Sequence, residues 1–207
     1  MVYLLILSRK RIKRLMENEA RVVILTADDL TLDKLSRNGC HMRDIAIMYI
    51  AGCSERKNIR YFVGKNGRPE LEGGSGWDFN ISHTEQLSIV GISEKRLGID
   101  VERVRTFSSK VVKKYYSEGE QLEVYGTQEE LRNRIICEIW TRKEAHCKYT
   151  GEGICRESLY WDSVKQLRMC EYTIKSFYFN NCVITVCLPY GKYVFQFMDI
   201  KDMMGEE

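Results

Sequence analysis

The chain has 207 residues, of which 44% are hydrophobic and 29% charged. This composition is typical of soluble globular proteins and differs from that of disordered chains. The 32 basic and 29 acidic residues leave a net charge of +3, which argues against nucleic-acid binding through overall positive charge. Any anion binding must therefore be local, and the length suits one larger domain or two small ones that share an interface.

The cysteines and the N-terminus indicate a cytoplasmic protein. None of the eight cysteines forms a C-x-x-C motif, and a zinc site around His146 and Cys147 lacks two further ligands at suitable spacing. Residues 2–7 are apolar and residues 9–14 are basic, the reverse of the order in a signal peptide. No apolar run approaches the length that spans a membrane. We therefore expect free thiols and a cytoplasmic location.

The first part of the chain mixes predicted helices and strands. Residues 2–7 are expected to form a buried strand, and the basic residues after them begin an amphipathic helix. A second helix is expected over residues 41–51 and a short strand over residues 59–63. Residues 64–76, GKNGRPELEGGSG, have the composition of turns and match neither a P-loop nor a complete G-x-G-x-x-G.

The middle of the chain predicts a hairpin. A strand over residues 87–92 and a strand over residues 97–104 are separated by a tight turn at residues 93–96. A helix is expected to follow, with apolar residues at positions 111, 112, 115 and 116.

The second part of the chain predicts one long helix followed by strands. The helix is expected to begin at a capping box formed by Thr127 and Glu130 and to end near Gly151. Residues 171–179, 182–188 and 193–199 predict a three-stranded meander. Helices are thus followed by strands twice, which indicates an α+β fold.

Two acidic residues stand on one predicted strand, in the sequence Gly-Ile-Asp-Val-Glu. The period of two along a strand puts Asp100 and Glu102 on the same face, ~6.6–6.8 Å apart at the backbone. Two carboxylates at this spacing can close around a hard cation such as Mg²⁺. The alternative is an ordinary solvated strand face.

A second group lies in the long helix, where Trp140, Glu144 and Lys148 follow one another at intervals of four residues on one side. Glu144 and Lys148 could form a simple exposed ion pair. The tryptophan instead indicates a partly buried face, on which Glu144 could meet the cation of Asp100 and Glu102 and Lys148 could meet a phosphate.

The third group is Phe-Asn-Ile-Ser-His-Thr at residues 79–84. Ser82 and His83 could contact a phosphate beside the glycine-rich loop that carries Arg68. Alternatively, the polar side chains around His83 close a turn through hydrogen bonds to the backbone.

The order F-N-I-S-H-T, G-I-D-V-E and W-T-R-K-E-A-x-x-K resembles the 4′-phosphopantetheinyl transferases, specifically the surfactin-synthetase-activating (Sfp-type) group. The resemblance covers about residues 59–153. It implies a pseudo-dimeric α+β fold of two similar halves, residues 1–103 and 104–207, with the active site at their interface. It also implies that coenzyme A and Mg²⁺ bind there.

The resemblance implies roles for individual residues. Asp100, Glu102 and Glu144 match the metal ligands that hold Mg²⁺ on the pyrophosphate of coenzyme A, and Lys148 matches the lysine on that pyrophosphate. The cofactor-binding motif covers Ser82, His83 and Thr84, of which the first two match the phosphate contacts. Gly67-Arg68-Pro69 resembles the G-K-P segment near the adenosine end, with arginine in place of lysine.

The implied activity is Mg²⁺-dependent transfer of 4′-phosphopantetheine from coenzyme A to a serine of an apo acyl or peptidyl carrier protein, which releases adenosine 3′,5′-bisphosphate. Glu144, Lys148 and Asp100 would form the catalytic set, with Glu144 taking the proton of the serine. We expect a monomer whose partners are coenzyme A and the carrier protein, with no nucleic-acid or membrane partner.

Two contacts that such an enzyme would make have only candidate residues here, and those for the 3′-phosphate do not align with the family. Arg9 to Arg14, Arg37 and Arg43 are candidates for binding the 3′-phosphate, or form a solvated basic face. Residues 110–116 offer lysines and apolar residues to an acidic carrier, or belong to the core.

Two other functions are compatible with the sequence. A non-catalytic module could bind nucleic acid or an acidic protein through the basic segment 9–14. A Mg²⁺-dependent phosphohydrolase could use the same carboxylates with water as the nucleophile.

Overall fold

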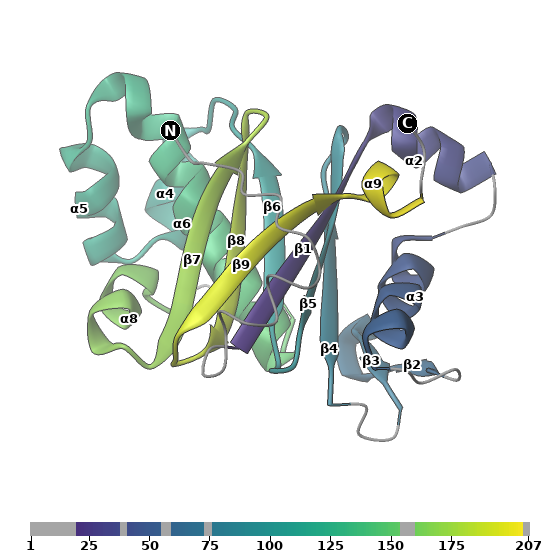
Figure 1. The fold of residues 1–207 in the computed structure, drawn as a ribbon. Helices are drawn as coiled ribbons and strands as arrows, with labels where there is room; N and C mark the ends of the chain where they lie inside the picture. Colours follow the sequence, from purple (N-terminus) through teal and green to yellow (C-terminus); the bar gives the residue numbers. More distant parts are fainter. Residues whose placement is uncertain (1–19, 38–40, 55–58, 73–75, 154–159, 205–207) are drawn as a thin grey trace.

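The computed structural model describes residues 20–37, 41–54, 59–72, 76–153 and 160–204 (Figure 1). The strand and the basic helix predicted at the N-terminus lie outside these ranges. The elements up to the middle of the chain are β1 (Ala20–Asp28), α2 (Asp29–Arg37), α3 (Met42–Ser54), β2 (Tyr61–Val63), the short 3₁₀ helix η1 (Lys65–Gly67), β3 (Pro69–Leu71), β4 (Asp78–His83), β5 (Leu87–Ser93) and β6 (Gly98–Arg103). The remaining elements are α4 (Ser109–Tyr115), α5 (Glu118–Gly126), α6 (Glu129–Thr150), α8 (Ser163–Met169), β7 (Tyr172–Phe179), β8 (Cys182–Pro189), β9 (Tyr193–Asp199) and α9 (Ile200–Met204).

The fold is α+β, with two main sheets and a separate pair of short strands, β2 and β3. One sheet has the strand order β4-β5-β1-β9 and the other has the order β6-β8-β7. All strand pairs are antiparallel except β1 with β9, which is parallel. No helix in the described part of the chain is long and apolar enough to cross a bilayer.

Two predicted strand pairings are wrong, for the same physical reason. The hairpin of residues 87–104 does not form, because β5 already has β4 and β1 on its two edges, and β6 pairs with β8 instead. The meander of residues 171–199 stops after two strands, because β6 occupies the second edge of β8, and β9 crosses to β1. A strand from before residue 104, β6, therefore pairs with β8 from after it, and β9 from the second part pairs with β1 from the first. The division into two similar halves, residues 1–103 and 104–207, stays a prediction.

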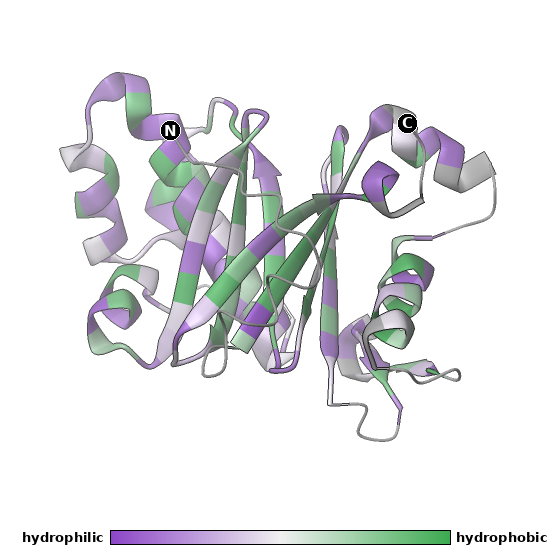
Figure 2. Ribbon diagram, in the orientation of Figure 1, coloured by the Kyte–Doolittle hydropathy of each residue, from purple (hydrophilic) through white to green (hydrophobic). Residues whose placement is uncertain are grey.

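The two sheets face each other across a shared hydrophobic core, and helices cover their outer faces (Figure 1). This inner core takes its side chains from β1, β5, β6 and β8. On the outer side of the first sheet, α3 packs against the faces of β1, β4 and β5 that point away from the inner core. On the outer side of the second sheet, α6 lies against β6 and β8. Figure 2 shows hydrophobic residues concentrated on the central strands. The alternation of side chains along each strand produces these layers.

Helix boundaries agree with the sequence in part. Helix α3 and the C-terminal end of α6 at Gly151 (φ 78°) confirm the predictions for those segments. The predicted capping box at Thr127 is wrong, since Gln128 caps α6 without a side-chain hydrogen bond and the Thr127 hydroxyl bonds to the carbonyl of Glu123. The capping box lies instead at the start of α5, between Ser117 and Glu120.

Gly98 allows α6 to approach β6 closely. A Cβ atom at this position would lie 2.0 Å from the carbonyl oxygen of Ala145 and 2.4 Å from the amide nitrogen of Tyr149. Both contacts are with backbone, which cannot rotate away as a flexible side chain can. The absence of a side chain at Gly98 therefore fixes how α6 lies on the strand that carries Asp100.

Gly98→Ala should lower the free energy of unfolding by about 1–3 kcal/mol, since overpacking forces the backbone of α6 to shift. Urea unfolding followed by circular dichroism measures the change. The control is Gly52→Ala in α3, where nothing lies within 4 Å of the added Cβ and alanine is the better helix former. Equal stability of Gly98→Ala and wild type would contradict this account of the packing.

His146 is a buried residue on the face of α6 that meets α8 and β7. Its ring stacks on Trp161 at a centroid distance of 4.0 Å and meets Tyr172 edge-on at 5.0 Å. Within the described residues neither ring nitrogen has a hydrogen-bond partner. Burial, helped by the nearby Lys143, lowers the pKa of His146 to about 4.

Because the folded state favours neutral His146, this residue stabilises the fold fully above pH 6.5, and the contribution is lost as the pH falls toward 4. The loss between pH 7.5 and pH 5 should be about 2 kcal/mol. Urea unfolding at the two pH values, compared with His146→Phe, isolates this loss from that of other groups. An imidazole resonance of His146 that titrates near pH 6.5 would refute the prediction.

Candidate functional site

Three elements bring the three sequence motifs together: β4 carries Ser82, β6 carries Asp100 and α6 carries Lys148. The Lys148 ammonium lies 2.8 Å from the Ser82 hydroxyl and 2.8 Å from Oδ1 of Asp100. The Ser82 hydroxyl also donates to Oδ1 of Asp100 at 2.8 Å. Ser82 and Asp100 are buried, while the Lys148 side chain keeps 29% of its surface exposed. The positively charged Lys148 side chain therefore lies at the edge of a buried polar cluster.

Side chains of β4 hold β6 in place beside it. Asp78, Asn80 and Ser82 occupy alternate positions, so they project from the same face of β4. Each accepts a hydrogen bond from a backbone N–H: Leu97 to Asp78 at 2.9 Å, Ile99 to Asn80 at 3.0 Å, and Val101 to Ser82 at 3.3 Å. The edge of β6 that faces away from β8 is thereby satisfied by side chains instead of a partner strand.

The three candidate carboxylates repel one another. Burial, with Asp100 as the next cause, raises the pKa of Glu144 to about 7, and Lys148 opposes this rise. Burial and the charge of Asp100 also raise the pKa of Glu102. The three groups therefore influence one another's protonation.

The donor chemistry of these residues fits a hard cation. Oδ2 of Asp100 is buried without a hydrogen-bond partner among the described residues. Carboxylate oxygens are the ligands that Mg²⁺ prefers. In the described part of the chain, however, no three histidine, cysteine, aspartate or glutamate residues form a group that could hold a metal ion. The assignment of Asp100, Glu102 and Glu144 as metal ligands stays a prediction that rests on their chemistry.

His83 and Thr84 lie at the end of β4 and have different surroundings from Ser82. His83 is exposed, and the alternation along the strand places its side chain on the face opposite that of Ser82. The Thr84 hydroxyl accepts hydrogen bonds from the amides of Gln86 and Leu87. Thr84 thus closes the turn between β4 and β5, which was the structural alternative for this motif.

Arg68 is placed differently from an exposed phosphate contact. It is 7% exposed, and its guanidinium donates to the carbonyl of Lys148 at 2.6 Å, to the carbonyl of Leu97 at 3.0 Å and to Asp78 at 2.7 Å. Burial lowers the pKa of Arg68, and Asp78 counteracts the shift. In this structure Arg68 joins protein groups, and its role in cofactor binding stays a prediction.

Sequence reasoning did not identify Asp78 and Asn80 as members of the site. Their signal was present, since polar residues at positions 78, 80 and 82 alternate with the apolar Phe79 and Ile81. This alternation indicates a strand with one polar face, and the fold turns that face toward the backbone of residues 97–101 instead of solvent.

The structure describes some of the residues predicted to bind the 3′-phosphate and the carrier protein. Arg43 lies over the ring of Tyr61 at 4.6 Å, and the basic segment 9–14 is outside the described ranges. On α4, Val112 packs in the core together with Tyr116, whereas Lys110, Lys113 and Lys114 are exposed.

Comparisons with known proteins relate part of the chain to one family. Residues 96–195 match the family model described as the 4′-phosphopantetheinyl transferase superfamily. A putative 4′-phosphopantetheinyl transferase of Synechocystis is 30% identical over 104 residues, which cover 47% of this chain and 42% of the relative. The 4′-phosphopantetheinyl transferase gsp of Aneurinibacillus migulanus is 28% identical over 98 residues (47% and 40%), and Sfp of Bacillus subtilis is 24% identical over 100 residues (48% and 45%). The chain thus spans less than half the length of these relatives.

Asn80→Ala should lower the free energy of unfolding by about 1–3 kcal/mol, because it leaves the buried N–H of Ile99 without an acceptor. Urea unfolding measures the loss, and Gln86→Ala at an exposed position of the following turn serves as the control. A loss no larger than that of the control would show that the N–H of Ile99 does not depend on Asn80.

Proposed function

We propose that the chain is a member of the 4′-phosphopantetheinyl transferase superfamily, whose family model matches residues 96–195, and that it transfers 4′-phosphopantetheine from coenzyme A to a serine of an apo acyl or peptidyl carrier protein. The observation that carries the proposal is the cluster of Ser82, Asp100 and Lys148, with Glu144 one helical turn before Lys148. A lysine at the edge of a buried cluster suits a polyanionic substrate such as a pyrophosphate.

In the proposed reaction the serine oxygen of the carrier attacks the β-phosphorus of coenzyme A. The bond between this phosphorus and the bridging oxygen breaks, and adenosine 3′,5′-bisphosphate leaves with the electron pair. Glu144, directly or through a water molecule, takes the proton of the serine. A carboxylate within reach of the serine hydroxyl can act as the general base of this step.

The Lys148 ammonium binds the pyrophosphate and offsets its charge. In the described structure this ammonium is paired with Asp100, and its exposed part leaves room for a second anionic partner. Electrostatic stabilisation of this kind is a large part of catalysis in phosphoryl transfer, where charge spreads over the phosphate oxygens.

Asp100, Glu102 and Glu144 are the residues that would hold Mg²⁺, and the unpartnered Oδ2 of Asp100 supports this choice. When bound, the metal would supply positive charge to the pyrophosphate and relieve the repulsion among the carboxylates. His83 and Ser82 are proposed to contact the phosphates of coenzyme A.

We further propose that the enzyme acts as a monomer in the cytoplasm. The residues named for the reaction all lie on one chain, and among the described cysteines Cys137, Cys170, Cys182 and Cys187 are free thiols.

The proposal is tested by the intact mass of an apo carrier protein after incubation with this protein, coenzyme A and Mg²⁺, with and without a chelator. We expect a chelator-sensitive gain of one phosphopantetheine group. Release of free phosphopantetheine without any carrier would instead support a phosphohydrolase. No gain across several acyl and peptidyl carriers, together with no binding of coenzyme A, would refute the proposed transfer.

Glu144→Gln should reduce turnover by about 10²–10⁴-fold while coenzyme A still binds, because the proton acceptor is lost and the side chain keeps its shape. Glu130→Gln, at an exposed position in the first turn of the same helix, should transfer at the rate of wild type. Turnover is measured by carrier mass and binding by calorimetry. Undiminished turnover of Glu144→Gln would exclude Glu144 from proton transfer.

A further inference from the structure

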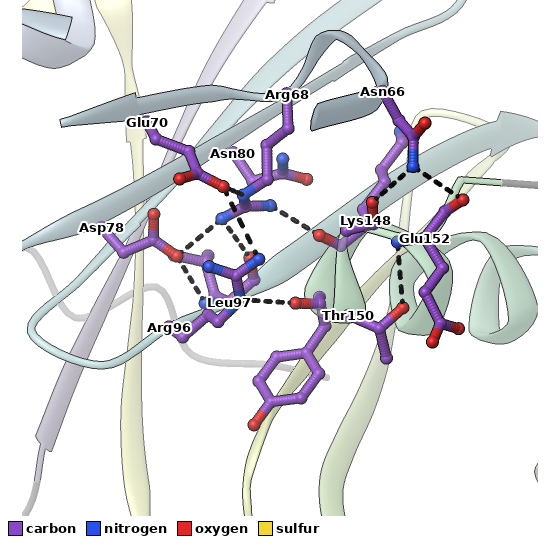
Figure 3. Close-up of polar contacts among 12 residues, drawn as sticks. Asn66, Arg68, Glu70, Asp78, Asn80, Arg96, Leu97, Lys148, Thr150 and Glu152 are labelled. Carbon is purple, nitrogen blue, oxygen red and sulfur yellow. Dashed lines mark hydrogen bonds and ion pairs between the residues drawn. The ribbon is translucent and has the colours of Figure 1, made fainter. Parts of the chain in front are cut away.

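Arg68 connects the same three elements that carry the polar cluster. Ser82, Asp100 and Lys148 come from β4, β6 and α6. The guanidinium of Arg68 bonds to Asp78 on β4, to the carbonyl of Leu97 immediately before β6, and to the carbonyl of Lys148 on α6 (Figure 3). One buried side chain therefore bonds to a side chain of β4, to the backbone just before β6 and to the backbone of α6 at Lys148 itself.

The C-terminal end of α6 is held by side chains from outside the helix. The last carbonyls of a helix have no partner within it. Here Arg68 bonds to the carbonyl of Lys148, Arg96 bonds to that of Tyr149 at 2.6 Å, and Asn66 bonds to those of Gly151 and Glu152 at 2.9 Å (Figure 3). We call Asn66, Arg68 and Arg96 the helix clamp. Its two arginines also place positive charge at the negative end of the helix dipole.

The clamp acts directly on Lys148. The carbonyl that Arg68 holds belongs to Lys148 itself, and the ammonium of the same residue makes the 2.8 Å contacts with Ser82 and Asp100. Because Arg68 is buried and both its terminal nitrogens have protein partners, its geometry fits a role in holding the backbone better than a contact with a mobile ligand. A fork of fixed shape can hold three elements at once, which a single ammonium does less well.

We propose that Arg68, supported by Arg96 and Asn66, is a positioning residue that sets the place of Lys148 relative to Asp100. This inference rests on the proposed function at one point: the binding of the pyrophosphate by Lys148. Displacement of a catalytic group by about 1 Å costs about 10²-fold in rate. The helix clamp is therefore expected to govern transfer without touching coenzyme A.

A double-mutant cycle separates positioning from direct binding. Arg68→Met should lower kcat/KM by about 10–100-fold in the wild-type background. In the Lys148→Met background the same substitution should have almost no further effect, since residues that act through one another are not additive. If Arg68 contacts coenzyme A independently of Lys148, the two losses will multiply, and that result would overturn the proposal.

A second variant keeps the test valid if Arg68→Met does not fold, and a third serves as its control. Arg96→Gln removes the bond to Tyr149 from a side chain that is 42% exposed, so the variant should fold even if Arg68→Met does not. Arg96→Gln should lower kcat/KM in the direction of Arg68→Met, and its cycle with Lys148→Met should also be non-additive. The matched control is Lys95→Gln, which removes one positive charge at the neighbouring exposed position and should match wild type.

A spectroscopic measurement makes the inference independent of transfer activity. The side-chain nitrogen of Lys148 can be followed by NMR in the protein without coenzyme A. Its resonance should move in Arg68→Met and in Arg96→Gln, because the contact with Asp100 changes, and should stay in place in Lys95→Gln. An unmoved resonance in both clamp variants would refute positioning, whereas failure of the wild-type protein to modify any carrier would refute the proposed function alone.

Discussion

The interaction on which the rest of the site depends is the set of hydrogen bonds between side chains of β4 and the backbone of β6. A strand at the edge of a sheet exposes N–H groups that must find acceptors once they are buried. Here the acceptors are Asp78, Asn80 and Ser82, and each is separated from its donor by 19 residues. The constant separation means that the two segments run in the same direction with the same rise. The two sheets are therefore joined by side-chain hydrogen bonds along β4, and in the described part of the chain no backbone pairing connects β4 with β6.

This junction explains why the polar residues of two motifs meet. The residues between the acceptors, Phe79 and Ile81, pack toward α3, and Ile99 and Val101 pack into the core between the sheets. Ser82 is the last acceptor of the series, and its hydroxyl also contacts Asp100 and Lys148. The same group thus ends the structural series and begins the chemical cluster. A change at Ser82 would disturb both.

Helix α6 completes the arrangement because it lies unusually close to β6. Gly98 leaves no room for a side chain between the strand and the helix backbone, and the helix clamp holds the C-terminal end of the helix. Residues 144 and 148 then stand one turn apart over the strand that carries Asp100. Close packing, more than any single ion pair, determines which groups face one another.

The sequence predicted the local features of this protein better than its strand pairing. The motifs around Ser82, Asp100 and Lys148 were recognised because residue spacing on a strand or helix is a local property. The hairpin at residues 87–104 and the meander at residues 171–199 were wrong, because the choice of partner depends on which sheet edges are already occupied. The burial of Arg68 could not be predicted either, since its partners, Leu97 and Lys148, lie far along the chain. The ligand role of Arg68 was inferred from the match of Gly67-Arg68-Pro69 to the G-K-P segment, and it stays a prediction.

The electrostatics of the cluster follow from this geometry. Asp100 has one oxygen shared by Ser82 and Lys148 and one buried oxygen that has no hydrogen-bond partner within the described ranges. Its charge contributes to the raised pKa values of both Glu102 and Glu144. Three acidic groups beside one lysine carry more negative than positive charge, and a polyanionic pyrophosphate would add to the excess. Under the proposed function, a bound cation would offset this excess, and Asp100 Oδ2, which has no hydrogen-bond partner among the described residues, is one of the oxygens that would bind it.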